Sequence, residues 1–334
     1  MTLLATRRNL LALTMILSGA LLLTGFASLM LGSVHLSFHE VWTGLRGRPL
    51  VPEARIIVRE IRLPRIILAT LVGAALAVAG TALQALLRNP LADPYVLGIS
   101  SGAALGEIVA LWLGGKAAAA SPLAAFAGAL ATMAWVYLLG WRAGRAASYT
   151  LVLAGVITAS FLSAIILFVL TLLSTRDVRG TAFWLMGDLS VVTDVQLRIV
   201  FPAIALTIAA LYLFAKDLNV LLLGEDEAAH LGVNVTRVET AVYLLASLLT
   251  GLAVSASGAI GYLGLLVPHL GRMLVGNDHR MLLPAAALGG AIVLVVSDTL
   301  ARTVIAPSEL PVGAVTAVVG APVFIYLLRR GGRG

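Results

Sequence analysis

The segment from Ile66 to Leu87 decides the fold, and it reads Ile-Ile-Leu-Ala-Thr-Leu-Val-Gly-Ala-Ala-Leu-Ala-Val-Ala-Gly-Thr-Ala-Leu-Gln-Ala-Leu-Leu. It carries no charged side chain and exceeds the ~20 residues that a helix needs to cross a bilayer. Further apolar blocks, separated by short polar breaks, are Leu10–Leu31, Val96–Leu113, Leu123–Trp141, Leu151–Leu173, Val195–Ala215, Val238–Val254, Ile260–Val275, Leu282–Val296 and Val312–Leu328. None of these blocks alternates with period two, as the strands of a membrane barrel must. The sequence therefore predicts an all-α membrane protein with about ten transmembrane helices, the eighth and ninth of them short.

The composition supports an integral membrane protein. Hydrophobic residues make up 60% of the 334 residues and charged residues only 12%, with a mean hydropathy of +1.01. Soluble domains have about 45–50% apolar and about 25% charged residues. No soluble domain stands out, so we expect one transmembrane domain over residues 1–334, embedded in the lipid bilayer. The net charge of +7 comes without a long basic tail, and no nucleic-acid partner is predicted.

The N-terminal apolar run is interpreted as a retained first span. Arg7 and Arg8 precede it, but the run is longer than the ~7–15 apolar residues of a signal peptide. An even number of spans places both termini on one side. With the termini inside, and without the first loop, twelve Lys and Arg residues face the cytoplasm against five outside. Because cytoplasmic loops carry an excess of Lys and Arg, both termini are predicted to be cytoplasmic.

The first polar loop breaks that charge rule. It follows the first span and carries six arginines, which this orientation places outside: Arg46, Arg48, Arg55, Arg59, Arg62 and Arg65. Basic charge on the outer face suggests an acidic partner there. Lipid headgroups are the alternative contact for these side chains.

Two polar segments on the opposite side are patterned as ordered structure. In the segment of residues 216–239, three acids follow Gly224, which suits the first turn of a helix, and Gly232 suits its end. This pattern predicts a docking helix on the membrane surface, although it could also be a simple connector. The second segment, Arg88-Asn-Pro-Leu-Ala-Asp-Pro94, contains two helix-breaking prolines and is predicted to be an ordered turn.

Few residues suggest chemistry inside the membrane. Gly98-Ile-Ser-Ser-Gly102 fits a serine-nucleophile pattern, but that pattern needs a strand-to-helix turn, and the glycine spacing suits close helix packing better. Glu107 is a carboxylate within the apolar block Val96–Leu113. Asp298 and Arg302, four residues apart, are expected to pair at the outer end of the ninth span. An intramembrane hydrolase using Ser100 and an ion-coupled carrier remain as alternative functions.

No metal or cofactor site is predicted. The chain has no cysteine, which excludes disulfides, thiol catalysis and thiolate metal ligands. His35 and His39 have helical spacing, but no clear third ligand accompanies them.

Longer motifs along the chain resemble a known family. They are Arg62-Leu-Pro-Arg65, Arg88-Asn-Pro-Leu-Ala-Asp-Pro-Tyr-Val-Leu-Gly-Ile-Ser-Ser-Gly-Ala-Ala-Leu-Gly106, Leu223-Gly-Glu-Asp-Glu-Ala-Ala-His-Leu-Gly-Val-Asn234, Gly258-Ala-Ile-Gly-Tyr-Leu-Gly-Leu-Leu-Val-Pro-His269, Asp278-His-Arg280 and Glu309-Leu-Pro-Val-Gly-Ala-Val-Thr-Ala-Val-Val-Gly-Ala-Pro322. Nearly the whole chain resembles the permease subunits of type II ABC importers, the iron-siderophore, haem and cobalamin uptake family.

The resemblance implies an assembly in a bacterial inner membrane. It implies a homodimer of ten-helix subunits, in which spans two to five and seven to ten are inverted repeats. It also implies two cytoplasmic ATPase subunits and a periplasmic substrate-binding protein. The chain has no Walker motif, so it is not expected to be an enzyme, and ATP hydrolysis would come from the partner.

The resemblance also implies roles for particular residues of this chain. Docking of the binding protein is assigned to Arg62, Arg65 and Arg302. Coupling to the ATPase is assigned to Glu225, Asp226, Glu227, His230, Leu231 and Gly232. The cytoplasmic gate matches Ser148 and Tyr149, although the cobalamin relative has small hydroxyl residues there and the tyrosine departs from that pattern. The translocation path, lined by the fifth and tenth spans, would include Gly155, Ala159, Ser160 and Ser163.

The predicted cargo is an iron chelate moved from periplasm to cytoplasm. Family membership ranks haem first, a ferric siderophore next and cobalamin third. No single residue of the sequence decides between them.

Overall fold

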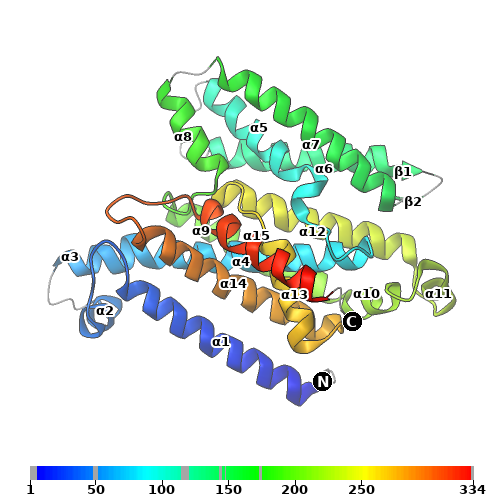
Figure 1. The fold of residues 1–334 in the computed structure, drawn as a ribbon, viewed down its shortest axis with the longest axis horizontal. Coiled ribbons are helices and arrows are strands. Elements are labelled where there is room, and N and C mark those ends of the chain that lie inside the picture. The colour runs from blue at the N-terminus through cyan, green and yellow to red at the C-terminus, as the bar shows by residue number, and fades with distance from the viewer. Residues whose placement is uncertain are drawn as a thin grey trace.

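The protein is a helical bundle in the computed structural model, which describes residues 6–47, 52–113, 120–142, 145–146, 148–172 and 175–331 (Figure 1). Its elements are α1 (Arg7–Met30), α2 (Phe38–Leu45), α3 (Pro52–Arg55), the π-helical η1 (Ile56–Arg62), α4 (Leu63–Leu86), the 3₁₀ turn η2 (Pro94–Leu97), α5 (Ile99–Trp112), α6 (Ala120–Gly140), β1 (Trp141–Arg142), β2 (Arg145–Ala146), α7 (Ser148–Leu170), α8 (Thr175–Leu185), α9 (Asp194–Tyr212), α10 (Ala215–Leu221), α11 (Glu225–His230), α12 (Val235–Ser257), α13 (Leu263–Val275), α14 (His279–Thr303) and α15 (Val312–Gly331).

The predicted all-α membrane fold is confirmed. Within the described ranges, seven helices are long and apolar enough to cross a membrane, and three shorter apolar helices match the remaining blocks. The expectation of a short ninth span is wrong, because α14 extends the apolar block Leu282–Val296 at both ends to 25 residues. The sequence did not predict the two-residue strands β1 and β2, which pair antiparallel between α6 and α7.

The arginine-rich loop is also corrected by the structure. Residues 52–62, expected as part of a polar loop, are helical and continue into α4 to form one helix of 35 residues. The stretch before Pro64 adopts π-helical hydrogen bonding, in which the Leu63 N–H donates to the Val58 carbonyl five residues earlier. Hydropathy could not predict this extension, because five charged residues interrupt it: Glu53, Arg55, Arg59, Glu60 and Arg62.

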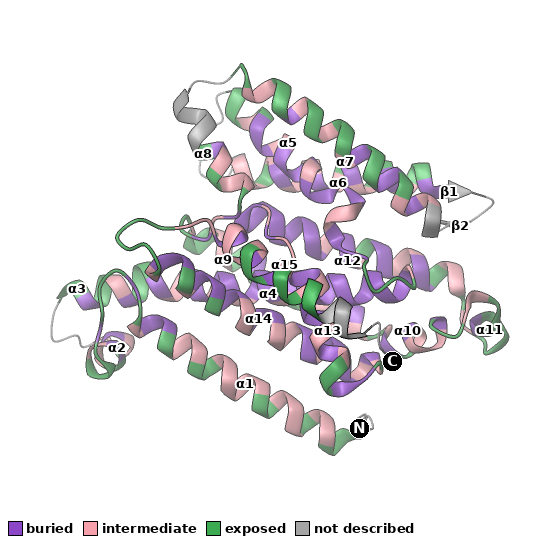
Figure 2. Cartoon of the chain, viewed as in Figure 1, coloured by how far each residue is buried: buried purple, intermediate pink, exposed green. Residues whose placement is uncertain are grey.

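Helix α4 forms the centre of the bundle. Its apolar stretch is 83% buried within the chain, whereas none of the corresponding part of α1 is buried (Figure 2). Glycines let α4 approach its neighbours closely: a Cβ at Gly73 would overlap the Gly290 backbone of α14, and a Cβ at Gly80 would overlap the Gly264 backbone of α13. Small residues at these two crossings therefore serve close helix packing.

The bundle has two distinct ends. The arginine end holds α2, α3 and the loop of residues 304–311, and the terminal end holds α10, α11 and both chain termini (Figure 1). Helix α4 begins at the arginine end, whereas α12 begins beside α11 at the terminal end. The two helices therefore run in opposite directions, as the first members of inverted repeats should.

Candidate functional site

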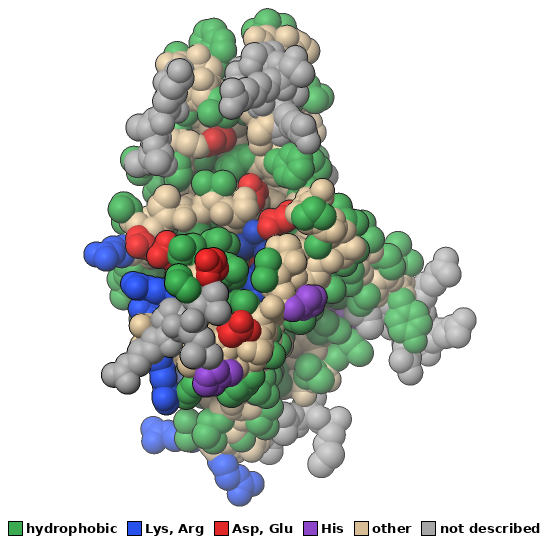
Figure 3. All heavy atoms as spheres, turned by 90° about the vertical axis from the view of Figure 1, so that its left-hand side faces the viewer, with side chains coloured by type: hydrophobic (Ala, Val, Ile, Leu, Met, Phe, Trp, Pro, Cys, Tyr) green, Lys and Arg blue, Asp and Glu red, His purple; other side chains and the backbone are tan. Residues whose placement is uncertain are grey.

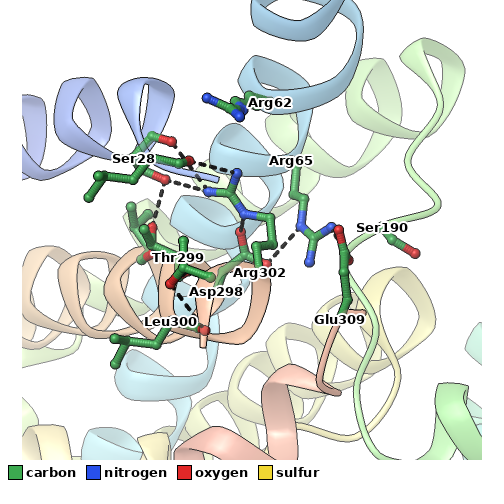
Figure 4. Close-up of polar contacts among 12 residues, drawn as sticks. Ser28, Arg62, Arg65, Ser190, Asp298, Thr299, Leu300, Arg302 and Glu309 are labelled. Atoms are coloured by element: carbon green, nitrogen blue, oxygen red, sulfur yellow. Dashed lines mark hydrogen bonds and ion pairs between the residues drawn. The ribbon is translucent and has the colours of Figure 1, made fainter. Parts of the chain in front are cut away.

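A buried ion-pair cluster lies at the arginine end (Figure 4). Its centre is Asp298 of α14, whose side chain is 1% exposed. The Asp298 carboxylate accepts hydrogen bonds from Arg65 Nε at 2.8 Å and from Arg302 Nε at 3.1 Å. The expected pairing of Asp298 with Arg302 is confirmed. Arg65, on α4, is 233 residues away in sequence, and this second pairing was not predicted.

Arg65 also bonds a second acid. Its Nη1 donates to Glu309 Oε2 at 2.7 Å, so one guanidinium bridges α14 and the loop before α15. The two acids differ in their surroundings, because the Glu309 side chain is 45% exposed while that of Asp298 is almost fully buried. Figure 3 shows acidic and basic side chains lying near one another across this end of the molecule.

The other two arginines are held by the end of α1. Arg62 donates from Nη1 to the Leu29 carbonyl at 2.6 Å and from Nη2 to the Val34 carbonyl at 2.5 Å. Gly32 leaves space for this guanidinium, since a Cβ there would overlap it. Arg302 donates from Nη2 to Ser28 Oγ at 2.7 Å.

The structure therefore brings the three predicted docking arginines together but does not leave them open. Arg62, Arg65 and Arg302 are each only 4–6% exposed. Their guanidinium groups bond carbonyls, carboxylates and a hydroxyl of this same chain. The sequence did not predict that Ser28 and Glu309 bond these arginines. For Glu309, the available signal was its position at the start of the motif Glu309–Pro322.

The terminal end presents a different surface. Helix α11 begins with Glu225 and ends at His230, and Gly232 follows with a φ of +86° that favours glycine. Asn234 caps the next helix by accepting a hydrogen bond from the Arg237 N–H. Three apolar side chains around α11 are exposed to 42–65%: Leu222, Leu223 and Leu231. The predicted helix–glycine–helix pattern is confirmed, and it combines acids in the first turn with exposed leucines.

The predicted ordered turn at residues 88–94 contacts this segment. Arg88 forms an ion pair with Glu225 of α11. On the other side, Gln84 Nε2 donates to the carbonyls of Ala92 at 3.2 Å and Gly264 at 3.0 Å, and Arg272 Nη1 donates to Gln84 Oε1 at 2.5 Å. A polar chain thus connects α11 through the turn to the interior helices α4 and α13.

Asp93 fixes the end of this turn. Its Oδ1 accepts a hydrogen bond from the Tyr95 N–H at 2.8 Å, and the Tyr95 hydroxyl accepts one from the Ile260 N–H at 2.6 Å. Burial raises the pKa of the Asp93 carboxyl to about 6, although the bond from Tyr95 opposes that shift. The turn is therefore a rigid part of the bundle, not a loose connection.

The predicted path residues divide between two surfaces of α7. Gly155 is buried, and a Cβ there would overlap Val96 and Leu97, so this glycine serves helix packing. Ala159 is half-buried beside Gly98. Ser160 and Ser163 lie on the exposed surface of the chain. The predicted gate residues Ser148 and Tyr149 begin α7, and their side chains lie outside the described part of the structure.

The remaining candidates lie in α5. Ser100 is 8% exposed within a helix, without the strand-to-helix turn that a nucleophile elbow requires. Glu107 is 5% exposed in the same helix. Among the described residues, no group of three His, Cys, Asp or Glu side chains could hold a metal ion.

Comparison with known proteins agrees with this arrangement. Residues 20–330 match the FecCD transport family. The hemin transport system permease protein HmuU of Yersinia pestis is 41% identical, with 93% of each chain covered. The cobalamin import system permease protein BtuC of Halobacterium salinarum is 45% identical over 84% of this chain and 75% of its own length.

A solved structure supports the same assignment. It is an inward-facing conformation of a metal-chelate type ABC transporter, with a TM-score of 0.85 and 32% identity, and the match covers 95% of this chain and 98% of that one. Fold, motifs and relatives together show that the chain belongs to the FecCD transport family.

Proposed function

We propose that this chain is the membrane-spanning subunit of an ATP-driven importer that carries an iron chelate, with haem as the first candidate. The observation that carries the proposal is the pair of specialised ends: an arginine cluster at one end and an acidic helix with exposed leucines at the other. A carrier subunit needs one surface for a cargo-delivering protein and another for a motor. Two copies of the chain, two ATPase subunits and one binding protein would form the working assembly.

The arginine end is proposed to dock the binding protein. Arg62, Arg65 and Arg302 are the docking candidates, and Arg55 and Arg59 add exposed basic charge at the same end. Charge-assisted hydrogen bonds contribute about 1.5–3 kcal/mol each, and salt should weaken docking. The test is the affinity of the binding protein for the permease in nanodiscs, with Arg62→Glu and Arg65→Glu combined. Unchanged affinity at low salt in a folded variant would refute the docking role.

The terminal end is proposed to receive the ATPase. Glu225, Asp226 and Glu227 suit a groove with basic edges, while Leu231 offers an exposed apolar contact. The ion pair between Arg88 and Glu225 provides a route by which movement of α11 reaches the interior helices. This end would then face the cytoplasm, as the positive-inside count predicts.

The cargo is proposed to cross between two copies of α7 and α15. Ser160 and Ser163 lie on the exposed surface of α7, and no charged residue occurs along that helix, which suits a wide path with little specific grip. A single cysteine at either position should react with a bulky thiol reagent and block transport. Thr158→Cys is a matched control, because Thr158 is two residues away and buried. Equal labelling of all three positions would place the path elsewhere.

The substrate ranking is tested by direct transport. The hemin relative matches along nearly its full length, which favours haem, while the cobalamin relative is more identical over a shorter region. The permease, reconstituted with its ATPase and binding protein, should accumulate hemin in vesicles only with ATP. Ferric hydroxamate and cobalamin, tested in parallel, would replace haem if they alone were accumulated.

The same experiment addresses the ion-coupled carrier. A carrier would transport without the ATPase and stop when the ion gradient collapses. Asp298 is buried at the arginine end and already forms ion pairs with two arginines. It is therefore poorly suited to bind and release a coupling ion in each transport cycle.

A further inference from the structure

We propose that Glu309 occupies the position on Arg65 that a carboxylate of the binding protein takes on docking. Docking would then exchange an internal ion pair for an intermolecular one. The inference rests on the proposed function, because it requires an acidic protein partner at the arginine end.

The two acids bonded to Arg65 are not equivalent. Asp298 is almost fully buried and is held by two arginines at 2.8 and 3.1 Å, so its removal would leave charges uncompensated in the interior. Glu309 is held by one hydrogen bond of 2.7 Å, and its side chain is 45% exposed. Water can solvate the half-exposed Glu309 carboxylate when it leaves Arg65, and Arg65 then keeps its bond to Asp298. Glu309 is therefore the replaceable partner, and it is bonded to Nη1 of Arg65.

The charge of the cluster favours such an exchange. Arg62, Arg65 and Arg302 give three positive charges against the two negative charges of Asp298 and Glu309, a formal balance of 3 − 2 = +1. If Glu309 moves away, the balance becomes +2 until another carboxylate arrives. A partner carboxylate would restore the original balance, whereas a neutral or basic partner would not.

The position of Glu309 links the exchange to the transport helices. Glu309 lies three residues before α15. The backbone around it is fixed, because the Leu310 N–H donates to the Ala301 carbonyl at 3.0 Å and the Val312 N–H donates to the Gly187 carbonyl at 3.1 Å. The Arg65–Glu309 bond connects α4 to this segment through side chains. Loss of this bond on docking of the binding protein would therefore remove a contact that holds the segment before α15 against α4.

The test measures binding-protein affinity for the full permease–ATPase complex in nanodiscs. Glu309→Gln removes the internal competitor, so we expect about two- to fivefold tighter binding at low salt, with a smaller gain at high salt. Glu309→Asp, which keeps the charge, should stay closer to the unchanged protein. The matched control is Glu53→Gln, which removes the same charge from the same end. Glu53 lies twelve residues before Arg65 along the continuous helical segment of residues 52–86.

The outcomes separate this inference from the proposed function. Equal or weaker binding of Glu309→Gln relative to Glu53→Gln would overturn the exchange, while docking itself would stand. Failure of the unchanged complex to bind any candidate binding protein would overturn the proposed function as well. A thermal unfolding curve for Glu309→Gln that matches the unchanged protein ensures that the affinity change does not come from misfolding.

A second measurement observes the exchange directly. The chain has no cysteine, so exposed Ser308 can be changed to cysteine and labelled with an environment-sensitive dye. Binding-protein addition should change the emission when Glu309 is present and change it less in the Glu309→Gln background. An identical response in both backgrounds would also overturn the exchange.

Discussion

The two ends of the molecule use charge in opposite ways. At the arginine end, the three basic side chains of the ion-pair cluster are at most 6% exposed and are bonded to groups of the same chain, and of the two acids in the cluster Glu309 is the exposed one. At the terminal end, the acids of α11 stand beside leucines exposed by up to 65%. Buried charge organises helices, whereas exposed charge mixed with exposed apolar surface is available to a partner. If the two ends dock partners as proposed, the ion-pair cluster of the arginine end has to reorganise first, whereas the terminal end does not.

The largest effect is expected at Asp298. Asp298→Asn would leave Arg65 and Arg302 without their shared counter-charge, and breaking a buried ion pair in this way costs about 3–5 kcal/mol. The measurement is the free energy of unfolding, or the unfolding temperature, of the purified permease. Glu309→Gln, which removes the half-exposed partner of Arg65, should cost less, because Arg65 keeps its bond to Asp298 and Glu309 is partly solvated. Equal losses for both variants would mean that burial does not distinguish the two acids.

A large functional effect without unfolding is expected at the terminal end. Leu231→Asp places a charge on the exposed apolar contact, and Gly232→Val forces a β-branched residue into a φ of +86°. Complexes of either variant with the ATPase subunits should hydrolyse ATP with little transport, measured as ATP consumed per substrate moved. Leu231→Met and Gly232→Asn are the matched controls, because methionine keeps the apolar contact and asparagine tolerates positive φ. Normal coupling in both disruptive variants would reduce α11 to a connector.

A smaller effect on stability is expected at Asp93, and it depends on pH. Asp93 is buried without an arginine, and its pKa of about 6 against 3.8 when unfolded corresponds to about 3 kcal/mol at 1.36 kcal/mol per unit. Because the folded state holds this proton more tightly, its stability should fall as pH rises from about 4 to about 6. Asp93→Asn keeps an acceptor for the Tyr95 N–H and should remove that loss. Parallel stability curves for both proteins over this range would show that Asp93 does not titrate as proposed.

How much of this could be predicted from the sequence depends on the distance between partners. Asp298 and Arg302 are four residues apart on a helix, so their pairing follows from periodicity alone. The ten apolar blocks predict ten helices because hydropathy is a local property. The bond from Arg65 to Asp298 joins residues 233 positions apart, and it depends on the close approach of α4 and α14 at Gly73 and Gly290.

Burial was the second quantity that the sequence could not supply. Charge alone predicts that the six arginines of the first loop form one exposed surface, because charged side chains favour contact with water or a partner. Arg62 is buried since Gly32 leaves space beside the last turn of α1, where carbonyl groups lack helical partners. Arg55 and Arg59, earlier in the same helical segment, remain exposed.

The smallest effect is expected where the terminal end meets the interior. The side chains of Arg88 and Glu225 are 42% and 30% exposed, so breaking their pair should cost less than about 1 kcal/mol of stability. Because the pair connects α11 to the turn at residues 88–94, Arg88→Glu should still lower transport per ATP, and the double variant Arg88→Glu with Glu225→Arg should restore part of it. Restoration separates a specific contact from a change in local charge. If the double variant is no better than either single one, movement of α11 reaches the bundle by another route, such as its direct connection to α12.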